Sequence, residues 1–283
     1  MIKIVVDSTC DLPQSFIEDH GITVLPLHVI VDGNDYLDGV DISTAEVFSL
    51  MRRGVMPTTA QVNLVDAYCS IGALADAGDD VLCLMFSSKM SSTYQSISLV
   101  ISDLREKYDG QKFVALDSEG GSFATGLITM EAVKTVESGS TFEEVVDRCK
   151  FLIDHVEHVF TIDDLKWMVR GGRISKTAGF TADLLNIKPI LDVDDGVMEV
   201  IHKIRGRKRA MEKVADIVAS RVKECQSQVI GITHADDIPA AETMRELLRV
   251  RLPKADFLIE KIGAVLGVHL GIGGVGVFFF NQM

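Results

Sequence analysis

Positive charge is scarce in this sequence of 283 residues, in which 28 lysines and arginines stand against 41 aspartates and glutamates. The formal net charge is -13. An acidic chain of this kind repels polyanions such as DNA and the surfaces of anionic membranes. The composition therefore disfavours a nucleic-acid-binding protein and leaves room for no more than transient contact with a membrane.

Cysteine is rare, and no CxxC pair is present. The five cysteines are Cys10, Cys69, Cys83, Cys149 and Cys225. An odd number of them, mostly inside apolar runs, indicates small buried side chains in a reducing compartment rather than disulfides or a structural zinc site. The N-terminus, MIKIVVDSTCDL, lacks the apolar core of a signal peptide. We therefore expect a cytoplasmic protein without a metal site.

Three catalytic signatures are absent: the phosphate loop GxxxxGK followed by Ser or Thr, the zinc motif HExxH and the nucleophile motif GxSxG. Their absence disfavours an autonomous P-loop nucleotide enzyme and two common hydrolase classes. The segment from Gly271 to Gly276 matches GxGxxG, but no helix follows it and the chain ends soon after, so dinucleotide binding is disfavoured. His155 and His158 form an HxxH pair at the end of an amphipathic helix, where a metal site is not expected.

Strand-length apolar runs alternate with segments of helical periodicity in the first part of the chain. These runs are Ile2 to Val6, Ile22 to Val31, Val81 to Phe86, Lys112 to Leu116 and His158 to Ile162. The alternation is typical of an α/β sheet. Capping boxes predict helix starts at Ser43 to Glu46 and at Thr141 to Glu144.

The pattern changes after about residue 165. We expect a short helix beyond Gly172, then a hairpin, then a helix from Arg207 to about Cys225. A strand Gln228 to Thr233 and a helix from about Pro239 to Arg249 follow. The last two apolar runs are Ala255 to Ile262 and Val275 to Phe280. The hairpin strands are Pro189 to Val193 and Val197 to Ile201. We therefore predict an α/β domain over 1–164 and an α+β domain over 165–283, with a ligand crevice between them.

The stretch from Ile262 to Phe280 has the length of a membrane span and contains no Asp, Glu, Lys or Arg. It also contains six glycines and His269. A buried core segment that includes a loop is therefore expected, rather than a transmembrane helix.

Hydroxyl and carboxylate clusters occur at three places, two of them directly after expected strands and one between two helical segments. Asp7, Ser8, Thr9 and Asp11 come after the first strand, Pro57 to Gln61 form a polar turn, and Ser87 to Thr93 follow Phe86. At the carboxyl ends of parallel strands such groups can bind a carboxylate or phosphate. The alternative is helix capping, which is favoured for Asp11 ahead of Pro13.

Three cationic or titratable features have two interpretations each. Arg173, after the pair Gly171 and Gly172, either binds an anion or follows a helix C-cap. His269, among glycines and apolar residues, is either functional or a hydrogen-bonded core histidine. The dense basic run comprises His202, Lys203, Arg205, Arg207, Lys208 and Arg209. A docking site for an anionic ligand or partner is favoured there over a solvated helix start, because cations oppose the dipole at a helix N-terminus.

Eight segments occur in a fixed order along nearly the whole chain: DSTCDL, PTTAQV, FSSKMSSTYQS, the Asp117 and Ser118 turn, LKWMVRGGRIS, LLNIKPIL, KIRGRKRA and GVHLGIGG. Their order and spacing resemble the DegV family of bacterial fatty-acid-binding proteins. The resemblance implies an N-terminal Rossmann-like α/β domain and a C-terminal α+β domain that enclose one long-chain fatty acid, such as palmitate, stearate or oleate. It implies no cofactor and no catalytic activity of the chain itself. A separate ATP-dependent fatty-acid kinase would phosphorylate the bound acid, giving acyl-phosphate for phospholipid synthesis.

The resemblance also implies roles for particular residues. Thr59 and Ser91 would bind the carboxylate, and Arg173 and His269 would bind the acid and assist its phosphorylation. The basic run at Lys203, Arg205 and Arg207 would meet the kinase. The chain departs from the family pattern at Ala60, Val62, Ser92 and Ile272, which would alter the head-group pocket or the preferred acid.

Two other classes of function remain open. A lipid carrier or lipid-responsive regulator would bind the acid without a kinase. A lipid-acting hydrolase or transferase would need a base beside Ser91 or Thr59.

Overall fold

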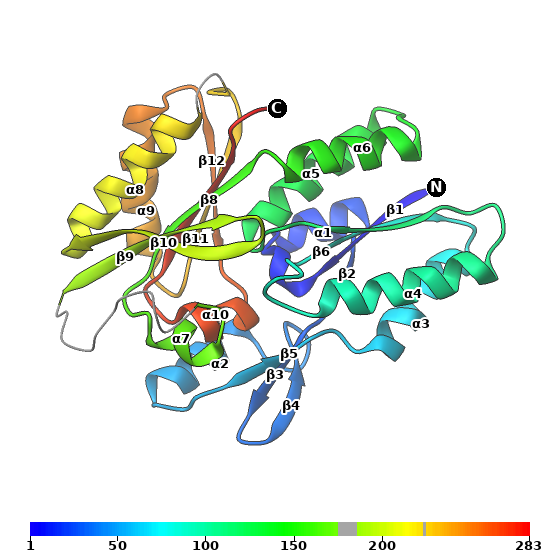
Figure 1. Ribbon diagram of the computed structural model, residues 1–283, viewed down its shortest axis with the longest axis horizontal. Coiled ribbons are helices and arrows are strands. Elements are labelled where there is room, and N and C mark those ends of the chain that lie inside the picture. The colour runs from blue at the N-terminus through cyan, green and yellow to red at the C-terminus, as the bar shows by residue number, and fades with distance from the viewer. Residues whose placement is uncertain (175–185, 223–224) are drawn as a thin grey trace.

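The computed structural model describes residues 1–174, 186–222 and 225–283, and these residues form a mixed α/β protein (Figure 1). The strands β1 (Ile2–Asp7), β2 (Thr23–Leu25), β6 (Asp80–Met85) and β7 (Phe113–Asp117) form the first sheet. They are all parallel, in the order β2-β1-β6-β7. The α/β class and the parallel N-terminal sheet predicted from the sequence are confirmed.

Helices surround this sheet, and a small antiparallel sheet lies beside it. The helices are α1 (Gln14–His20), α2 (Thr44–Arg52), α3 (Leu64–Asp76), α4 (Thr93–Lys107), α5 (Phe123–Glu137) and α6 (Phe142–Ile153), after a short 3-10 turn at Ser8–Cys10. The small sheet has the order β4-β3-β5, from β3 (His28–Val31), β4 (Asn34–Leu37) and β5 (Thr58–Ala60). Its strand β5 carries Thr59 toward the second half of the molecule.

The second large sheet has six strands. They are β8 (Val156–Thr161), β9 (Ile187–Asp194), β10 (Val197–Arg205), β11 (Val229–His234), β12 (Asp256–Lys261) and β13 (Val275–Phe280), in the order β10-β9-β8-β13-β11-β12. Its helices are α7 (Lys166–Gly171), α8 (Arg207–Val222), α9 (Ile238–Arg251) and α10 (Ala264–Leu270). A C-terminal sheet domain with helices, as the sequence predicts, is confirmed.

The chain passes from the first large sheet to the second before residue 164, the expected limit between the two domains. Strand β8 pairs antiparallel with β13 and with β9, so it belongs to the second sheet. The sequence places this strand with the first domain because its apolar run resembles the preceding ones. The change of sheet falls between Ile153, the end of α6, and Val156, the start of β8.

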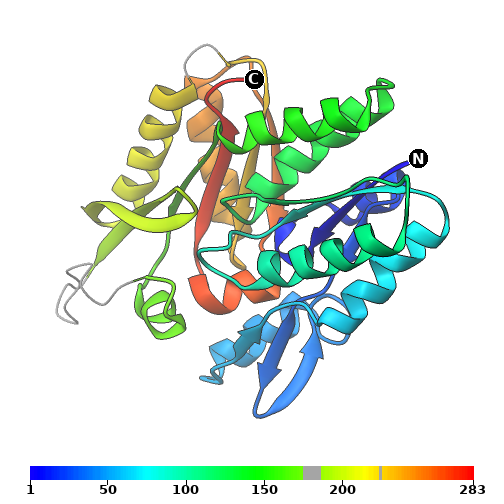
Figure 2. The same ribbon diagram turned by 45° about the vertical axis from the view of Figure 1, so that its right-hand side comes forward.

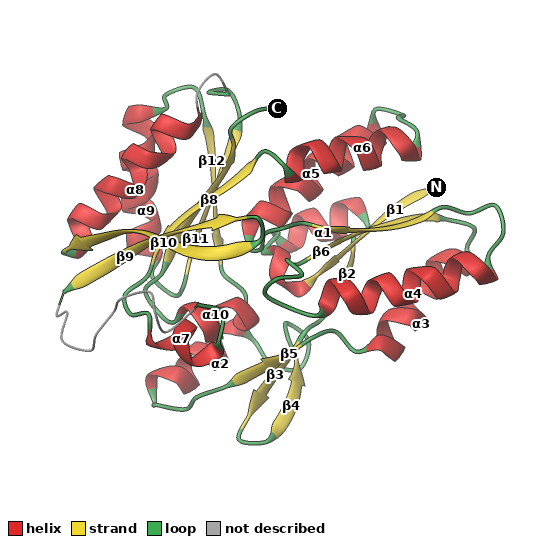
Figure 3. Cartoon of the chain, in the orientation of Figure 1, coloured by secondary structure: helices red, strands yellow, loops and turns green. Residues whose placement is uncertain are grey.

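Helix α5 joins the two halves of the molecule. Helices α8 and α9 pack on one side of the six-stranded sheet, and α5 and α6 lie on its other side (Figure 3). One core cluster contains Leu84 of β6, Phe123 of α5 and Phe278 of β13. Gly231 in β11 leaves room for the Phe123 ring, since a Cβ at this glycine would lie 1.9 Å from it. The halves therefore share a continuous core.

The expected strand from Ile22 to Val31 is two strands. Strand β2 ends at Leu25 and β3 begins at His28, and the two belong to different sheets. Pro26 lies between them and has no backbone N–H to donate to a ladder, so a continuous central strand is not formed here. The expected single strand is therefore wrong, and Pro26 is the residue that divides it.

The carboxylate cluster after β1 does not cap helix α1. This helix begins after Pro13 without a side-chain cap, so the expected capping role of Asp11 is wrong. Asp11 instead accepts hydrogen bonds from the Ser122 hydroxyl, at 2.5 Å, and from the Gly263 N–H, at 2.7 Å. Asp7 accepts from the N–H groups of Thr9 and Phe86. The cluster therefore ties the first strand to distant loops.

Several local predictions are confirmed. Both capping boxes are formed, at the starts of α2 and α6. The hairpin β9–β10 has a two-residue turn at Asp195 and Gly196, both with positive φ, as such turns require. The apolar stretch from Ile262 to Phe280 forms α10, a glycine loop and the buried strand β13. The short helix expected beyond Gly172 and the end of the helix expected to reach Cys225 fall largely on residues outside the described ranges.

Candidate functional site

A cavity of about 300 Å³ lies between β5, the loops that follow β6 and β7, the six-stranded sheet and α10. Figure 2 shows β13, in red, running along the sheet from α10, which precedes it in the chain. Most side chains on the cavity wall are apolar, among them Phe86, Met90, Phe160, Met198, Leu266 and Phe278. Such a wall suits a predominantly apolar ligand.

Thr59 and His269 meet at one end of this cavity. The Thr59 Oγ1 lies 2.7 Å from His269 Nε2, so strand β5 and the end of α10 are joined by a hydrogen bond. Burial and the positive charge of Arg173 lower the pKa of His269 to about 4. The imidazole is therefore neutral at pH 7. Gly171 makes this packing feasible, because a Cβ there would lie 2.3 Å from His269 Nδ1.

Arg173 lines the same end of the cavity, directly after the C-cap of α7. Gly172 adopts the left-handed conformation that ends α7, so the C-cap interpretation of the glycine pair is confirmed. The guanidinium of Arg173 donates to the carbonyl oxygens of Met90, at 3.2 Å, and Gly171, at 2.7 Å. Burial lowers its pKa, but a guanidinium stays charged at neutral pH. It is a fixed cation beside His269.

Ser91 is the fourth polar residue at this end of the cavity. We call the group of Thr59, Ser91, Arg173 and His269 the outer end. The Ser91 hydroxyl accepts from the Thr93 N–H at 3.2 Å and lies 3.0 Å from the Thr93 hydroxyl, at the start of helix α4. The neighbouring Ser92 is exposed and also lines the cavity. A partial positive charge at this helix terminus favours an anion near Ser91.

A second polar group lies elsewhere on the cavity wall, and we call it the inner end: Ser122, Thr233 and His158. All three side chains are buried, in contrast to the partly exposed residues of the outer end. Burial lowers the pKa of His158 to about 4, so its imidazole is neutral at pH 7. The cavity wall therefore carries one partly exposed polar group and one buried polar group.

The inner end is tied to the carboxylates after β1. Asp11 accepts a hydrogen bond from the Ser122 hydroxyl. Burial raises the pKa of Asp11 to about 8, although its hydrogen bonds from Ser122 and Gly263 oppose this rise. Asp38 accepts from Ser8 at 2.9 Å, and burial raises its pKa to about 6. Both carboxylates face the start of α10, the helix that carries His269.

The sequence matches the model of one protein family over residues 1–282, described as an uncharacterised protein, DegV family COG1307. The chain belongs to the DegV family. A DegV domain-containing protein of Clostridium acetobutylicum is 36% identical to it over 286 residues, which cover 99% of both chains. The expected family is thus confirmed over the full length of the chain.

Solved structures of other DegV proteins share this fold. A DegV family protein from Thermus thermophilus, described as fatty acid binding, is 29% identical with a TM-score of 0.91 over 99% of both chains. A stearic-acid-binding protein from Eubacterium ventriosum is 26% identical with a TM-score of 0.91 over 98% of this chain and 97% of that one. The fatty acid kinase B3 protein of Streptococcus pneumoniae, loaded with linoleic acid, is 19% identical with a TM-score of 0.88 over the whole of both chains, and shares the fold.

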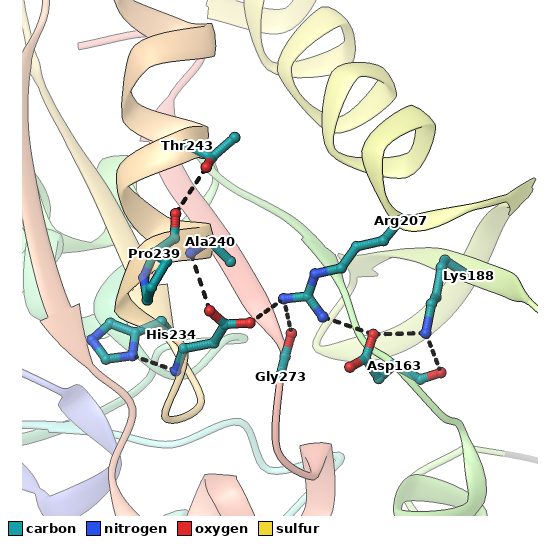
Figure 4. Close-up of polar contacts among 9 residues, drawn as sticks. Asp163, Lys188, Arg207, His234, Pro239, Ala240, Thr243 and Gly273 are labelled. Atoms are coloured by element: carbon teal, nitrogen blue, oxygen red, sulfur yellow. Dashed lines mark hydrogen bonds and ion pairs between the residues drawn. The ribbon is translucent and has the colours of Figure 1, made fainter.

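Within this DegV protein, Arg207 from the basic run lies in an internal network (Figure 4). Its guanidinium donates to Asp163 at 2.8 Å, to Asp237 at 2.7 Å and to the Gly273 carbonyl oxygen at 2.8 Å. Lys188 donates to the same Asp163 carboxylate at 2.7 Å. Arg207 thus fixes the glycine loop between α10 and β13, a role that the sequence did not indicate.

The other members of the basic run lie on the surface. Lys203, Arg205 and Arg209 line a shallow groove of about 370 Å³ formed by β10 and α8. Two carboxylates, Glu212 and Asp216, line it too. A role of Lys203 and Arg205 in docking a partner stays a prediction, whereas Arg207 faces inward.

The four residues expected to bind the acid are brought together, but the sequence did not indicate the inner end. Ser122 belongs to none of the candidate motifs, Thr233 was expected only as the end of a strand, and His158 only as a strand start and a member of the HxxH pair. Of the four departures from the family pattern, Ala60 and Ser92 line the cavity. Val62 and Ile272 instead belong to the apolar core beside it.

The described residues were also expected to hold neither a metal site nor a membrane span. Among them, no group of three or more His, Cys, Asp or Glu side chains is arranged to hold a metal ion. Within those same ranges, each helix is too short or too polar to cross a bilayer.

Proposed function

We propose that this DegV protein binds one long-chain fatty acid, with its carboxylate at the outer end of the cavity and its acyl chain along the apolar wall. The observation that carries the proposal is the convergence of Thr59, Ser91, Arg173 and His269 on one end of an apolar cavity of about 300 Å³. The fatty-acid binding named for the relatives from Thermus thermophilus and Eubacterium ventriosum supports the same ligand class.

The apolar wall supplies the driving force for binding. Each methylene removed from water contributes about 0.8 kcal/mol before the costs of ordering the chain. Tight binding therefore does not need a full ion pair at the carboxylate. The volume is close to the lower end of the range for small-molecule sites, about 300–1,000 Å³.

The outer end suits a carboxylate that stays reactive. Thr59 and Ser91 offer neutral hydroxyls, and the imidazole of His269 is neutral because its pKa lies at about 4. Neutral donors hold a carboxylate without neutralising it, so its oxygen remains a nucleophile. Arg173 supplies the positive charge that stabilises a phosphoryl group as it is transferred.

The finer proposal is that a separate ATP-dependent kinase phosphorylates the bound acid and that the chain itself is not an enzyme. Ala60 and Ser92, at the outer end, are exposed, so a partner can approach the carboxylate there. The groove with Lys203 and Arg205 is a surface for such a partner. The product would be an acyl-phosphate for phospholipid synthesis.

A lipid-acting hydrolase has one observation in its favour, the contact between Thr59 and His269. A catalytic triad also needs a group that orients the imidazole through its other nitrogen. Among the described residues, His269 Nδ1 has no hydrogen-bond partner. The geometry therefore supports binding over hydrolysis. A carrier without a kinase uses the same cavity and differs only in its partner.

The test is phosphorylation of the bound acid by the fatty-acid kinase of the same organism with ATP. We expect acyl-phosphate from the complex and none from the isolated chain. Arg173→Ala should keep the acid bound but lower the rate of phosphorylation. An unchanged rate in that variant would contradict the role of Arg173, and a complex without any acyl-phosphate would leave a carrier or regulator as the function.

A further inference from the structure

The inner end is a buried polar group on the wall of a largely apolar cavity. Ser122 is 5% exposed, Thr233 is 1% exposed and His158 is 3% exposed. All three line the same cavity as the outer end. A plain hydrocarbon chain has no group that can bond to them, so this end is unexplained by the proposed function.

Only part of the hydrogen-bonding capacity of the two hydroxyls is used. The Ser122 proton goes to Asp11, over an oxygen-to-oxygen distance of 2.5 Å. The Thr233 Oγ1 lies 3.4 Å from the Ser122 Oγ, which is a long contact for two hydroxyls. Thr233 therefore retains capacity for a ligand at this end.

His158 presents a donor without an acceptor. Its Nε2 accepts the N–H of Gly121 at 3.4 Å, so in the neutral ring the proton resides on Nδ1. The Nδ1 atom is buried and has no partner among the described residues. The ring stands edge-on to Phe278, which also lines the cavity. A buried N–H without an acceptor is unfavourable, and an oxygen atom in the cavity would satisfy it.

The surroundings select a neutral oxygen rather than a second carboxylate. The neutral imidazole of His158 provides no positive charge. Arg173, the cation that lines the cavity within the described ranges, is bound to Met90 and Gly171 at the outer end. Asp11 lies behind Ser122 and, with a pKa of about 8, is mostly protonated at pH 7, so it supplies no charge that would hold an ion. A hydroxyl fits either group, because it can share a hydrogen bond with Thr233 or accept one from His158 Nδ1.

We propose that the inner end binds a hydroxyl group carried by the acyl chain far from its carboxylate, so that the preferred ligands are hydroxylated fatty acids. This inference rests on the proposed function for the position of the carboxylate. The hydroxyl shares a hydrogen bond with the Thr233 hydroxyl, and His158 Nδ1 is a second donor on the same cavity wall. The outer end holds the carboxylate as in a plain acid.

The test compares plain saturated acids with terminally hydroxylated acids of the same length, from dodecanoic to octadecanoic acid, by isothermal titration. At the length that places the hydroxyl beside Thr233, we expect the hydroxylated acid to bind about tenfold more tightly than its plain counterpart, as one additional hydrogen bond would give. Thr233→Val, which keeps the shape of the side chain, should remove this preference. Thr129→Val is the matched control, because Thr129 is buried on α5 and bonds to the Thr125 carbonyl oxygen outside the cavity.

The outcomes separate the two proposals. If hydroxylated acids bind no more tightly than plain acids at any length, the inner end does not bind a ligand hydroxyl and the inference is wrong. If Thr233→Val keeps the preference, the hydroxyl binds elsewhere, which also contradicts it. If neither series binds, the proposed function itself fails. Unchanged binding of plain acids by Thr233→Val shows that the variant is folded.

Discussion

The hydroxyl of Thr59 and the imidazole of His269 lie 2.7 Å apart, although 210 positions separate them in the sequence. The hydrogen bond joins β5 of the small sheet to the end of α10. Both residues line the cavity beside Arg173. A head-group site is thus assembled from distant parts of the chain.

Replacement of Thr59 by valine should weaken fatty-acid binding. Thr59→Val keeps the shape of the side chain and removes the hydroxyl that faces His269, so we expect the dissociation constant for palmitate to rise about tenfold, as for one lost hydrogen bond. Thr58→Val is the matched control, because Thr58 is exposed and does not line the cavity, whereas Thr59 does. Equal affinities for the two variants would show that Thr59 does not hold the carboxylate.

Gly171 should be required for the position of His269. A Cβ at this glycine would lie 2.3 Å from His269 Nδ1, so Gly171→Ala must displace the imidazole from Thr59. We expect weaker binding of the acid and little loss of secondary structure, measured by titration and circular dichroism. Gly72→Ala serves for comparison, since Gly72 lies within α3 and a Cβ there meets no atom within 4 Å. Wild-type affinity in Gly171→Ala would refute the requirement.

Replacement of Arg207 should lower the stability of the folded protein, whereas replacement of Arg205 should not. Arg207 bonds to Asp163, Asp237 and the Gly273 carbonyl oxygen, so Arg207→Gln should lower the free energy of unfolding by about 1–2 kcal/mol. Arg205 is exposed on the surface groove, and Arg205→Gln should leave unfolding by urea unchanged. If Arg205 docks the kinase, its variant should slow only the coupled phosphorylation. A variant of Arg207 as stable as the wild type would exclude the structural role.

Asp11 should make the protein less stable as the pH rises. Its pKa is raised by burial from 3.8 to about 8, so between these values the folded state binds more protons than the unfolded state. The free energy of unfolding therefore falls as the pH increases through this range. Urea unfolding at several pH values should show a weaker decline for Asp11→Asn than for the wild type. The control is Asp19→Asn, an exposed position on α1, and a decline identical in all three proteins would contradict the expectation.

The class of fold could be predicted from the sequence because it depends on local patterns, whereas the four residues of the outer end were implied only by the resemblance to the DegV family. Apolar runs, capping boxes and the turn at Asp195 and Gly196 are short-range signals. The predictions failed where partners are remote. The role of Asp11 depends on Ser122 and Gly263, which lie more than a hundred positions away. The internal position of Arg207 likewise follows from tertiary contacts, since its charge alone resembles that of Arg205.

The most direct test of the account is native mass spectrometry of the purified full chain, followed by solvent extraction and identification of the released lipid. The account predicts one long-chain fatty acid per chain, or stoichiometric uptake of added palmitate or oleate by a chain purified without lipid. A chain that carries no lipid and takes up neither acid would contradict the assignment of the cavity to a fatty acid.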